Sequence, residues 1–294
     1  MINLRTAFLC TLALGVVAPA DAKPKDRPPV EDEPLWMSDP EGLKLDIVQR
    51  FLERGEPVQA LALIAAMRNE GIEDPKLDVL QGIALRDQGM TSEAERLLLT
   101  AEKKMGRDVR PHAELCILYG GAARLDDAIA SCTRATELDQ GSAKSWNNLS
   151  YVLLGAGRGE DALDAAQHAV DLDGSQARYK NNLGFALAAN GRFDDAFDAF
   201  RSVGTVADAW YNVGVAYDHH GRPDDARAAW GKALLAEPAH FGARKALSPD
   251  VAIAPEVAPA GVPGATVPTP GAPPILVPDP KLPEDSKSSE GDPR

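Results

Sequence analysis

One pattern of residues recurs six times in this 294-residue chain at an almost constant interval. Each copy has an alanine at the same place, and these anchors are Ala60, Ala94, Ala128, Ala162, Ala196 and Ala226. Four of the five intervals are 34 residues and the last is 30. A unit of about 34 residues is the length of a helical hairpin that cannot bury its apolar face alone and therefore stacks on its neighbours. The interval predicts an all-α stack of hairpins.

The last three copies show the pattern most fully. They open with Trp146-Asn147-Asn148, Lys180-Asn181-Asn182 and Trp210-Tyr211-Asn212, and a Gly-Arg pair follows in each. We predict six hairpins, at residues 41–74, 75–108, 109–142, 143–176, 177–206 and 207–240, and a short polar capping helix at 241–247. The fifth copy is four residues short near its end, so we expect its second helix to lose about one turn. The shortening is either a tolerated loop deletion or a change in the curvature of the stack.

The sixth copy contains the residues that most clearly resemble a known repeat family. It contains Trp210, Val213-Gly214, Tyr217, Ala226, Trp230, Ala233 and Pro238 in the order typical of the tetratricopeptide repeat. The resemblance covers roughly residues 41–240. It implies a right-handed superhelical solenoid of about six hairpins, with a concave groove in which partner peptides lie.

The two ends of the chain differ from the repeats in composition. Arg5, an apolar run over 7–17 and an Ala-x-Ala site are typical of a signal peptide over 1–22, cleaved after Ala22. Residues 23–40 read as a charged, proline-containing linker. Residues 248–294 are rich in proline and poor in large apolar residues, so we expect a disordered tail. Export to the periplasm or the outer membrane is the expected location.

The resemblance also implies which residues contact a partner. Positions 2, 5, 6, 9 and 12 of each first helix tend to face the groove in this family. Position 2 is basic in four successive copies, which suggests a ladder of cations that selects carboxylates on an extended, acidic partner or its free C-terminus. The candidate groove residues are Lys76, Arg110, Lys144, Asn147, Asn148, Tyr151, Arg178, Asn181, Asn182, Phe185, Tyr211 and Asn212.

Two interpretations of the asparagines remain open. A side-chain amide both donates and accepts hydrogen bonds, so it can bind a peptide backbone, but it can equally hold neighbouring helices together. The basic residues have a similar alternative, because a Lys or Arg near a helix start is usually a solvated charge.

Cys116 and Cys132 lie in the third hairpin on opposite helices. In an exported protein this pair suggests a disulfide. However, both fill places that small apolar residues take in other copies, so two buried free thiols are the alternative.

The composition and motifs exclude several classes of protein. A net charge of −13 argues against a nucleic-acid partner, which requires a basic face. The five histidines do not have the spacing of a zinc site, and nucleotide-binding and hydrolase motifs are absent from the sequence. We therefore expect no catalytic residues, no metal site and no cofactor.

These observations predict a non-enzymatic scaffold that binds a peptide or helix of another protein in the bacterial cell envelope. Residues 181–188 and 191–197 are similar to TadD-type proteins of tight-adherence pilus assembly. Two alternatives remain. The first is a factor in cell-wall or outer-membrane biogenesis that is tethered through its proline-rich tail. The second is an accessory subunit that regulates an envelope enzyme.

Overall fold

The computed structural model describes residues 39–248, and within them it contains thirteen α-helices and no strand. The predicted all-α fold of about six hairpins with a short cap is confirmed. The predicted signal peptide, its cleavage after Ala22, nearly all of the linker and the tail beyond Ser248 lie outside the described residues. Residues 39–43 belong to a different compact unit from residues 44–248, and in them the Asp39 carboxylate accepts a hydrogen bond from the Gly42 amide at 2.8 Å.

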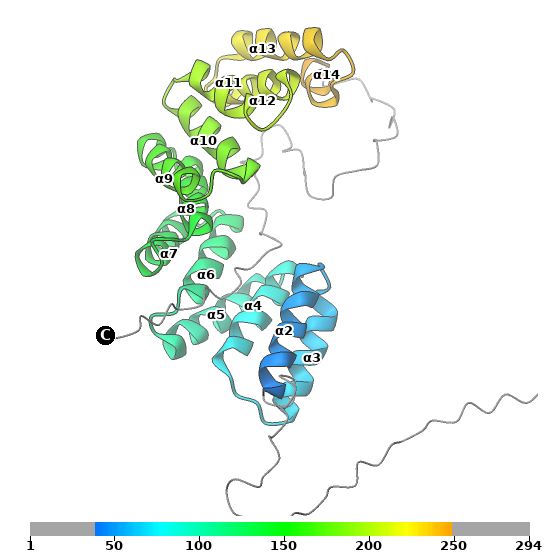
Figure 1. Cartoon of the computed structure of the whole chain (residues 1–294), viewed down its shortest axis with the longest axis vertical. Coiled ribbons are helices and arrows are strands. Elements are labelled where there is room, and N and C mark those ends of the chain that lie inside the picture. Colours follow the sequence, from blue (N-terminus) through cyan, green and yellow to red (C-terminus); the bar gives the residue numbers. More distant parts are fainter. Residues whose placement is uncertain (1–38, 249–294) are drawn as a thin grey trace, which may run out of the picture. The chain divides into compact units, whose positions relative to one another are not determined.

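Each predicted repeat contains one pair of helices (Figure 1). The pairs are α2 (Pro40–Glu53) and α3 (Pro57–Asn69), α4 (Pro75–Asp87) and α5 (Thr91–Met105), α6 (Val109–Gly121) and α7 (Leu125–Leu138), α8 (Ala143–Gly155) and α9 (Gly159–Leu172), α10 (Ala177–Ala189) and α11 (Phe193–Arg201), and α12 (Val206–His219) and α13 (Pro223–Ala236). The cap is α14 (Phe241–Leu247). We call the two members of a pair its first and second helix.

The turn inside each hairpin requires a left-handed residue. Glycine supplies it in five hairpins, for example Gly157 with φ 71° and Gly221 with φ 66°. The third hairpin has Ala123 instead, at φ 55°, the one non-glycine residue with positive φ among those described. In four hairpins the arginine that follows pairs with an aspartate three residues on, as Arg158 does with Asp161. Each of these turns therefore passes directly into the second helix.

Small residues on the first helices let the second helices pack closely. A Cβ added at Gly184 would lie 2.5 Å from the ring of Phe200, and one at Gly214 would lie within 3.0 Å of three indole atoms of Trp230. In the fourth hairpin Ser150 takes this place, and its hydroxyl donates to the Ala162 carbonyl at 2.8 Å. The large residues Phe200 and Trp230 thus lie directly over the glycines.

Successive repeats are joined by contacts between their first helices and by contacts of each second helix with the next first helix. The first helices contact one another in order, α4 with α6, α6 with α8, α8 with α10, and α10 with α12. Charged side chains reinforce some of these steps: Arg86 on α4 pairs with the buried Glu114 on α6. Asp78 accepts hydrogen bonds from Arg68 at 2.6 Å and from Lys104 at 2.9 Å. Burial raises the pKa of Asp78, but the hydrogen bonds from Lys104 and Arg68 outweigh it and leave this pKa below its ordinary value.

The fifth repeat is the exception in this stack. Its second helix, α11, has 9 residues, whereas the other second helices have 13 to 15, which confirms the predicted loss of about one turn. Near this repeat the buried apolar core also divides: one cluster extends from Val48 to Ala186, a second begins at Leu187, and a third lies around Tyr211 and Trp230. None of the helices in residues 39–248 is long and apolar enough to cross a bilayer.

Candidate functional site

The predicted partner-binding residues lie on five first helices, α4, α6, α8, α10 and α12. The residues at positions 2, 5, 6 and 9 of each copy, counted from residues 75, 109, 143, 177 and 207, are named the first-helix face here. Because neighbouring first helices contact one another, equivalent positions of successive repeats come next to each other along the stack. A ligand on this face would therefore contact several repeats at once.

Two of the asparagines hold repeats together. The side-chain amide of Asn182 on α10 donates to the side-chain oxygen of Asn147 on α8 at 2.8 Å, and Asn147 is buried. Further along the same interface Asn190 donates to the Gly159 carbonyl at 2.8 Å. Asn147 and Asn182 therefore hold neighbouring helices together, because their side chains are hydrogen-bonded to each other within the folded chain.

The other three asparagines differ. Within residues 39–248, the side-chain amides of Asn148, Asn181 and Asn212 make no hydrogen bond to another group. Asn147 and Asn182 occupy position 5 of one copy and position 6 of the next, and Asn181 and Asn212 occupy the same two positions one repeat later. The first pair is hydrogen-bonded, but the second pair is not. At the position equivalent to Asn147, α6 has Ala113, which offers no polar atom to Asn148. Asn148 is 6% exposed and the other two are half-buried.

The predicted ladder of cations is not uniform. Arg110 donates two hydrogen bonds to the carboxylate of Asp108, at 2.9 and 2.6 Å. These bonds lower the pKa of Asp108 despite its partial burial, and the charge of Lys76 lowers it further. Asp108 therefore neutralises part of the positive charge at the first two positions. The sequence pattern missed this because Asp108 precedes α6 as its N-cap residue rather than lying on the helix.

The second half of the ladder contains Lys144 and Arg178, both half-buried. The guanidinium of Arg178 lies 5.1 Å from the centre of the Tyr179 ring. Hydrogen bonds from Ser175 lower the pKa of Asp173, and the charge of Arg178 contributes to the same shift. Lys144 has no carboxylate partner among the described residues, so its ammonium group is available to a ligand.

The three aromatic candidates have different surroundings. Tyr151 is half-buried, and Phe185 packs edge-on against Phe200 with ring centres 4.9 Å apart. Tyr211 is 6% exposed, and a Cβ at Gly242 of α14 would lie 2.8 Å from its ring. Tyr211 therefore belongs to the packing of the cap and does not present its ring to a partner.

Cys116 on α6 and Cys132 on α7 form a disulfide, with Cα atoms 4.9 Å apart. Both residues are buried, at 1% and 0% exposure, and belong to the same apolar cluster. The bond crosslinks the two helices of the third hairpin.

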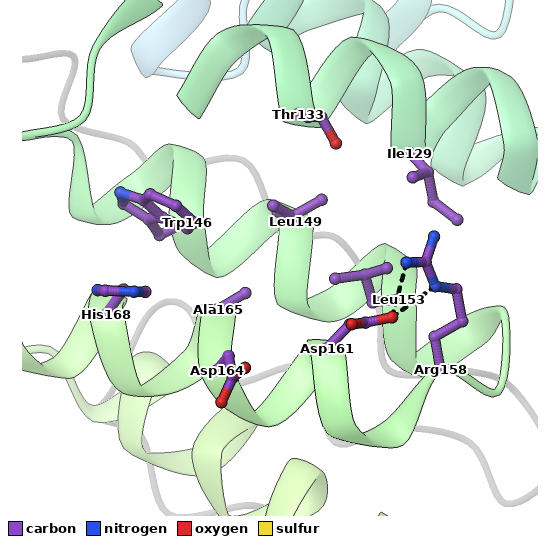
Figure 2. Close-up of a pocket in the computed structure, with 10 residues that line it drawn as sticks. All are labelled: Ile129, Thr133, Trp146, Leu149, Leu153, Arg158, Asp161, Asp164, Ala165 and His168. Atoms are coloured by element: carbon purple, nitrogen blue, oxygen red, sulfur yellow. Dashed lines mark hydrogen bonds and ion pairs between the residues drawn. The ribbon is translucent and has the colours of Figure 1, made fainter. Parts of the chain in front are cut away.

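The sequence pattern gave no indication of a cleft between α7, α8 and α9 (Figure 2). Its volume is about 240 Å³, and Ile129, Leu149 and Trp146 are among its lining residues. No group of three or more His, Cys, Asp or Glu side chains in residues 39–248 is arranged to hold a metal ion.

Comparison with known proteins identifies the repeats. Tetratricopeptide-repeat models match residues 114–177, 147–203 and 207–240. The chain is a tetratricopeptide-repeat protein. No curated protein sequence matches it. Such repeats form extended binding surfaces for other proteins, so the chain is a protein-interaction scaffold in its general class.

Among solved structures, the chain is similar to MamA, with 26% identity over 53% of this chain and 94% of the other and a TM-score of 0.45. A MamA fragment from Desulfovibrio magneticus RS-1 has 23% identity over 56% of this chain and 93% of the other, with a TM-score of 0.49. YrrB, described as a TPR protein with an unusual peptide-binding site, has 22% identity over 62% of this chain and 95% of the other, with a TM-score of 0.49.

Proposed function

We propose that this protein is a non-enzymatic scaffold that captures an extended peptide segment of a partner protein on the first-helix face of its fourth to sixth repeats. The observation that carries the proposal is the set of three side-chain amides, Asn148, Asn181 and Asn212, that have no hydrogen-bond partner within residues 39–248. The atoms of these amides are not among the fully buried, unpartnered side-chain atoms of residues 39–248, so they are open to solvent and a bound peptide can replace their water with backbone hydrogen bonds.

An extended peptide fits these amides because its backbone offers both N–H and C=O groups, and an asparagine can bond to either. Lys144 lies on α8, four residues before Asn148, and can pair with a carboxylate of the bound segment. A side-chain carboxylate and a free C-terminus both meet this requirement. We therefore retain an acidic or C-terminal segment as the proposed ligand, recognised chiefly at Lys144 and less by Lys76 and Arg110, which Asp108 partly neutralises.

Site-specific photo-crosslinking in an envelope extract tests the location of the binding surface. A photoreactive residue at Asn181 or Asn212 should form an adduct with the partner, whereas one at the exposed Lys103 on α5 should not. The triple variant Asn148→Ala, Asn181→Ala, Asn212→Ala should lose capture while its circular dichroism spectrum is retained. Undiminished capture by a folded triple variant contradicts the proposal.

Charge reversal tests the chemistry of the ligand. Lys144→Glu combined with Arg178→Glu should weaken capture and abolish its dependence on salt, whereas Lys76→Glu should have a smaller effect because Asp108 already lies near that charge. If the double variant Lys144→Glu, Arg178→Glu and the single variant Lys76→Glu weaken capture equally, Lys144 does not recognise an acidic ligand.

We also propose that the scaffold acts in the bacterial envelope, in the assembly of a pilus or a secretion system. The supporting observations are the signal-peptide pattern over 1–22 and the similarity of residues 181–188 and 191–197 to TadD-type proteins. N-terminal sequencing of the protein from a periplasmic or outer-membrane fraction should begin at Lys23. Deleting residues 249–294 separates this role from that of a wall-bound tether: a pilus scaffold keeps its partner, and a tether loses its location.

A further inference from the structure

The cleft between α7, α8 and α9 lies on a different side of α8 from the first-helix face. It is lined by Trp146, Leu149 and Leu153, which are positions 4, 7 and 11 of their copy, whereas the first-helix face uses positions 2, 5, 6 and 9. Figure 2 shows Thr133 and Ile129 on one wall and His168, Ala165 and Asp164 on the other, with Leu149 between them. The cleft is therefore a second site, formed where two successive second helices flank one first helix.

The lining combines an apolar floor with an acidic edge. The rings of Trp146 and His168 lie with centres 4.7 Å apart. Arg158 and Asp161 neutralise each other, with a nitrogen–oxygen distance of 2.6 Å. Asp164 is exposed and has no ion-pair or hydrogen-bond partner among residues 39–248. The cleft thus offers apolar contact and one negative charge that the chain itself does not use.

The equivalent place two repeats further on shows what fills such a space. Phe197 follows the anchor Ala196 as Ile129 follows Ala128, and Trp210 opens its copy as Trp146 does. The ring of Phe197 lies against the ring of Trp210 with centres 4.4 Å apart. The ammonium group of Lys232 lies over the same indole, 4.0 Å from its centre. Between the third and fourth repeats the smaller Ile129 replaces phenylalanine, and the space remains open.

We propose that this cleft binds an aromatic side chain of a partner protein, and that an arginine or lysine beside that side chain pairs with Asp164. The volume of about 240 Å³ is sufficient, since an engineered cavity of about 150 Å³ accommodates benzene. The indole of Trp146 offers a ring for aromatic contact, as Trp210 does for Phe197, whose ring is tilted from it by 38°. The carboxylate of Asp164, with the overall charge of −13, favours a cationic neighbour on the ligand.

The sequence outside residues 39–248 argues for a separate partner rather than an internal ligand. Residues 249–294 contain no Phe, Tyr or Trp. Trp36 in the N-terminal segment closely follows Glu31, Asp32 and Glu33, whose charges are like that of Asp164. The occupant with matching chemistry is an Arg-Phe or Lys-Phe type sequence in another protein.

The probe for this site is the peptide acetyl-Gly-Phe-Arg-Gly-amide, titrated into the full chain labelled with 5-fluorotryptophan and followed by fluorine NMR. The resonance of Trp146, assigned with Trp146→Phe, should shift and saturate, while those of Trp210 and Trp230 stay in place. Replacing the peptide's phenylalanine by alanine, or its arginine by glutamate, should weaken binding at least tenfold. A shift at Trp210 or Trp230 without one at Trp146 would overturn the assignment.

Two variants of the chain complete the test. Ile129→Phe should fill the cleft as Phe197 does in its own repeat, and so abolish binding of the peptide without lowering the melting temperature. Asp164→Lys should weaken binding at least fivefold, whereas Asp198→Lys, at the same position of the next repeat, should leave it unchanged. Wild-type affinity in a folded Asp164→Lys protein overturns the proposal even if Ile129→Phe fails to fold. Lys144→Glu should not affect this peptide, because it acts on the other site.

Discussion

The close contact between Gly214 and Trp230 provides the most direct test of how the hairpins are packed. Trp230 lies on α13 with 8% of its surface exposed, and its indole N–H donates to the Tyr211 carbonyl at 3.3 Å. A methyl group at Gly214 would come within 3.0 Å of three indole atoms. Gly214→Ala therefore forces the indole to move, which strains the core and lengthens this hydrogen bond.

The magnitude follows from opposing effects. Alanine in a helix interior stabilises relative to glycine by about 0.5 to 1 kcal/mol. Overpacking a filled core costs about 1 to 3 kcal/mol, and losing a hydrogen bond costs about 1 kcal/mol more. We expect Gly214→Ala to reduce the free energy of unfolding by about 2 kcal/mol, a fall of about 4 to 8 °C in Tm for a chain of this size.

Gly231 offers a matched control on α13. Nothing lies within 4 Å of a Cβ added there, so Gly231→Ala should gain only the helix preference and raise Tm. Both variants are compared by circular dichroism melting and by urea unfolding. A Gly214→Ala protein that melts at or above the wild-type temperature would refute the packing described for this hairpin. In the Trp230→Leu background the cost of Gly214→Ala should largely disappear, since the obstructing ring is absent.

Three further predictions concern other parts of the chain. Ala123→Gly should raise the free energy of unfolding by up to about 1 kcal/mol, because φ 55° is strained for alanine, and Ala122→Gly at φ −87° should lower it; urea titration distinguishes them. Reducing the Cys116–Cys132 bond, which closes a loop with a sequence separation of 16, should cost about 3 kcal/mol, and alkylation of the unfolded but unreduced protein should label neither cysteine. The lowered pKa of Asp78 means that its ion pairs stabilise the fold above the unfolded pKa of about 3.9 and are lost as the pH falls through the folded value. Asp78→Asn should therefore flatten the acid limb of a plot of stability against pH, and an unchanged limb would contradict this role.

The repeat architecture was predictable from the sequence because it depends on residues that act locally. The anchor alanines fix the period, glycine fixes the turn, and the four missing residues shorten α11 as expected. The interval between the anchor alanines can be measured in the sequence without knowing which residues contact each other across repeats.

The candidate site was less predictable because it depends on contacts between repeats. A pattern of positions could not distinguish Asn147, bonded to Asn182, from Asn181, which has the same place one repeat later. Nor could it show that Asp108 holds Arg110, or that Gly242 covers Tyr211, since these partners lie outside the helices that carry the predicted residues. The cleft beside Trp146 depends on the size of one side chain, Ile129, in the preceding repeat.

The short α11 has a consequence for how the chain unfolds. In a repeat array each unit is stabilised by its neighbours, so cooperativity is only as strong as the weakest interface. The interface after α11 lacks the Asn–Asn hydrogen bond of the preceding step, and the buried core divides near it. Amide hydrogen exchange should then show α12 to α14 opening at a lower free energy than α4 to α9. A peptide bound across Asn148, Asn181 and Asn212 would span this boundary and raise the protection of the C-terminal helices to that of the rest.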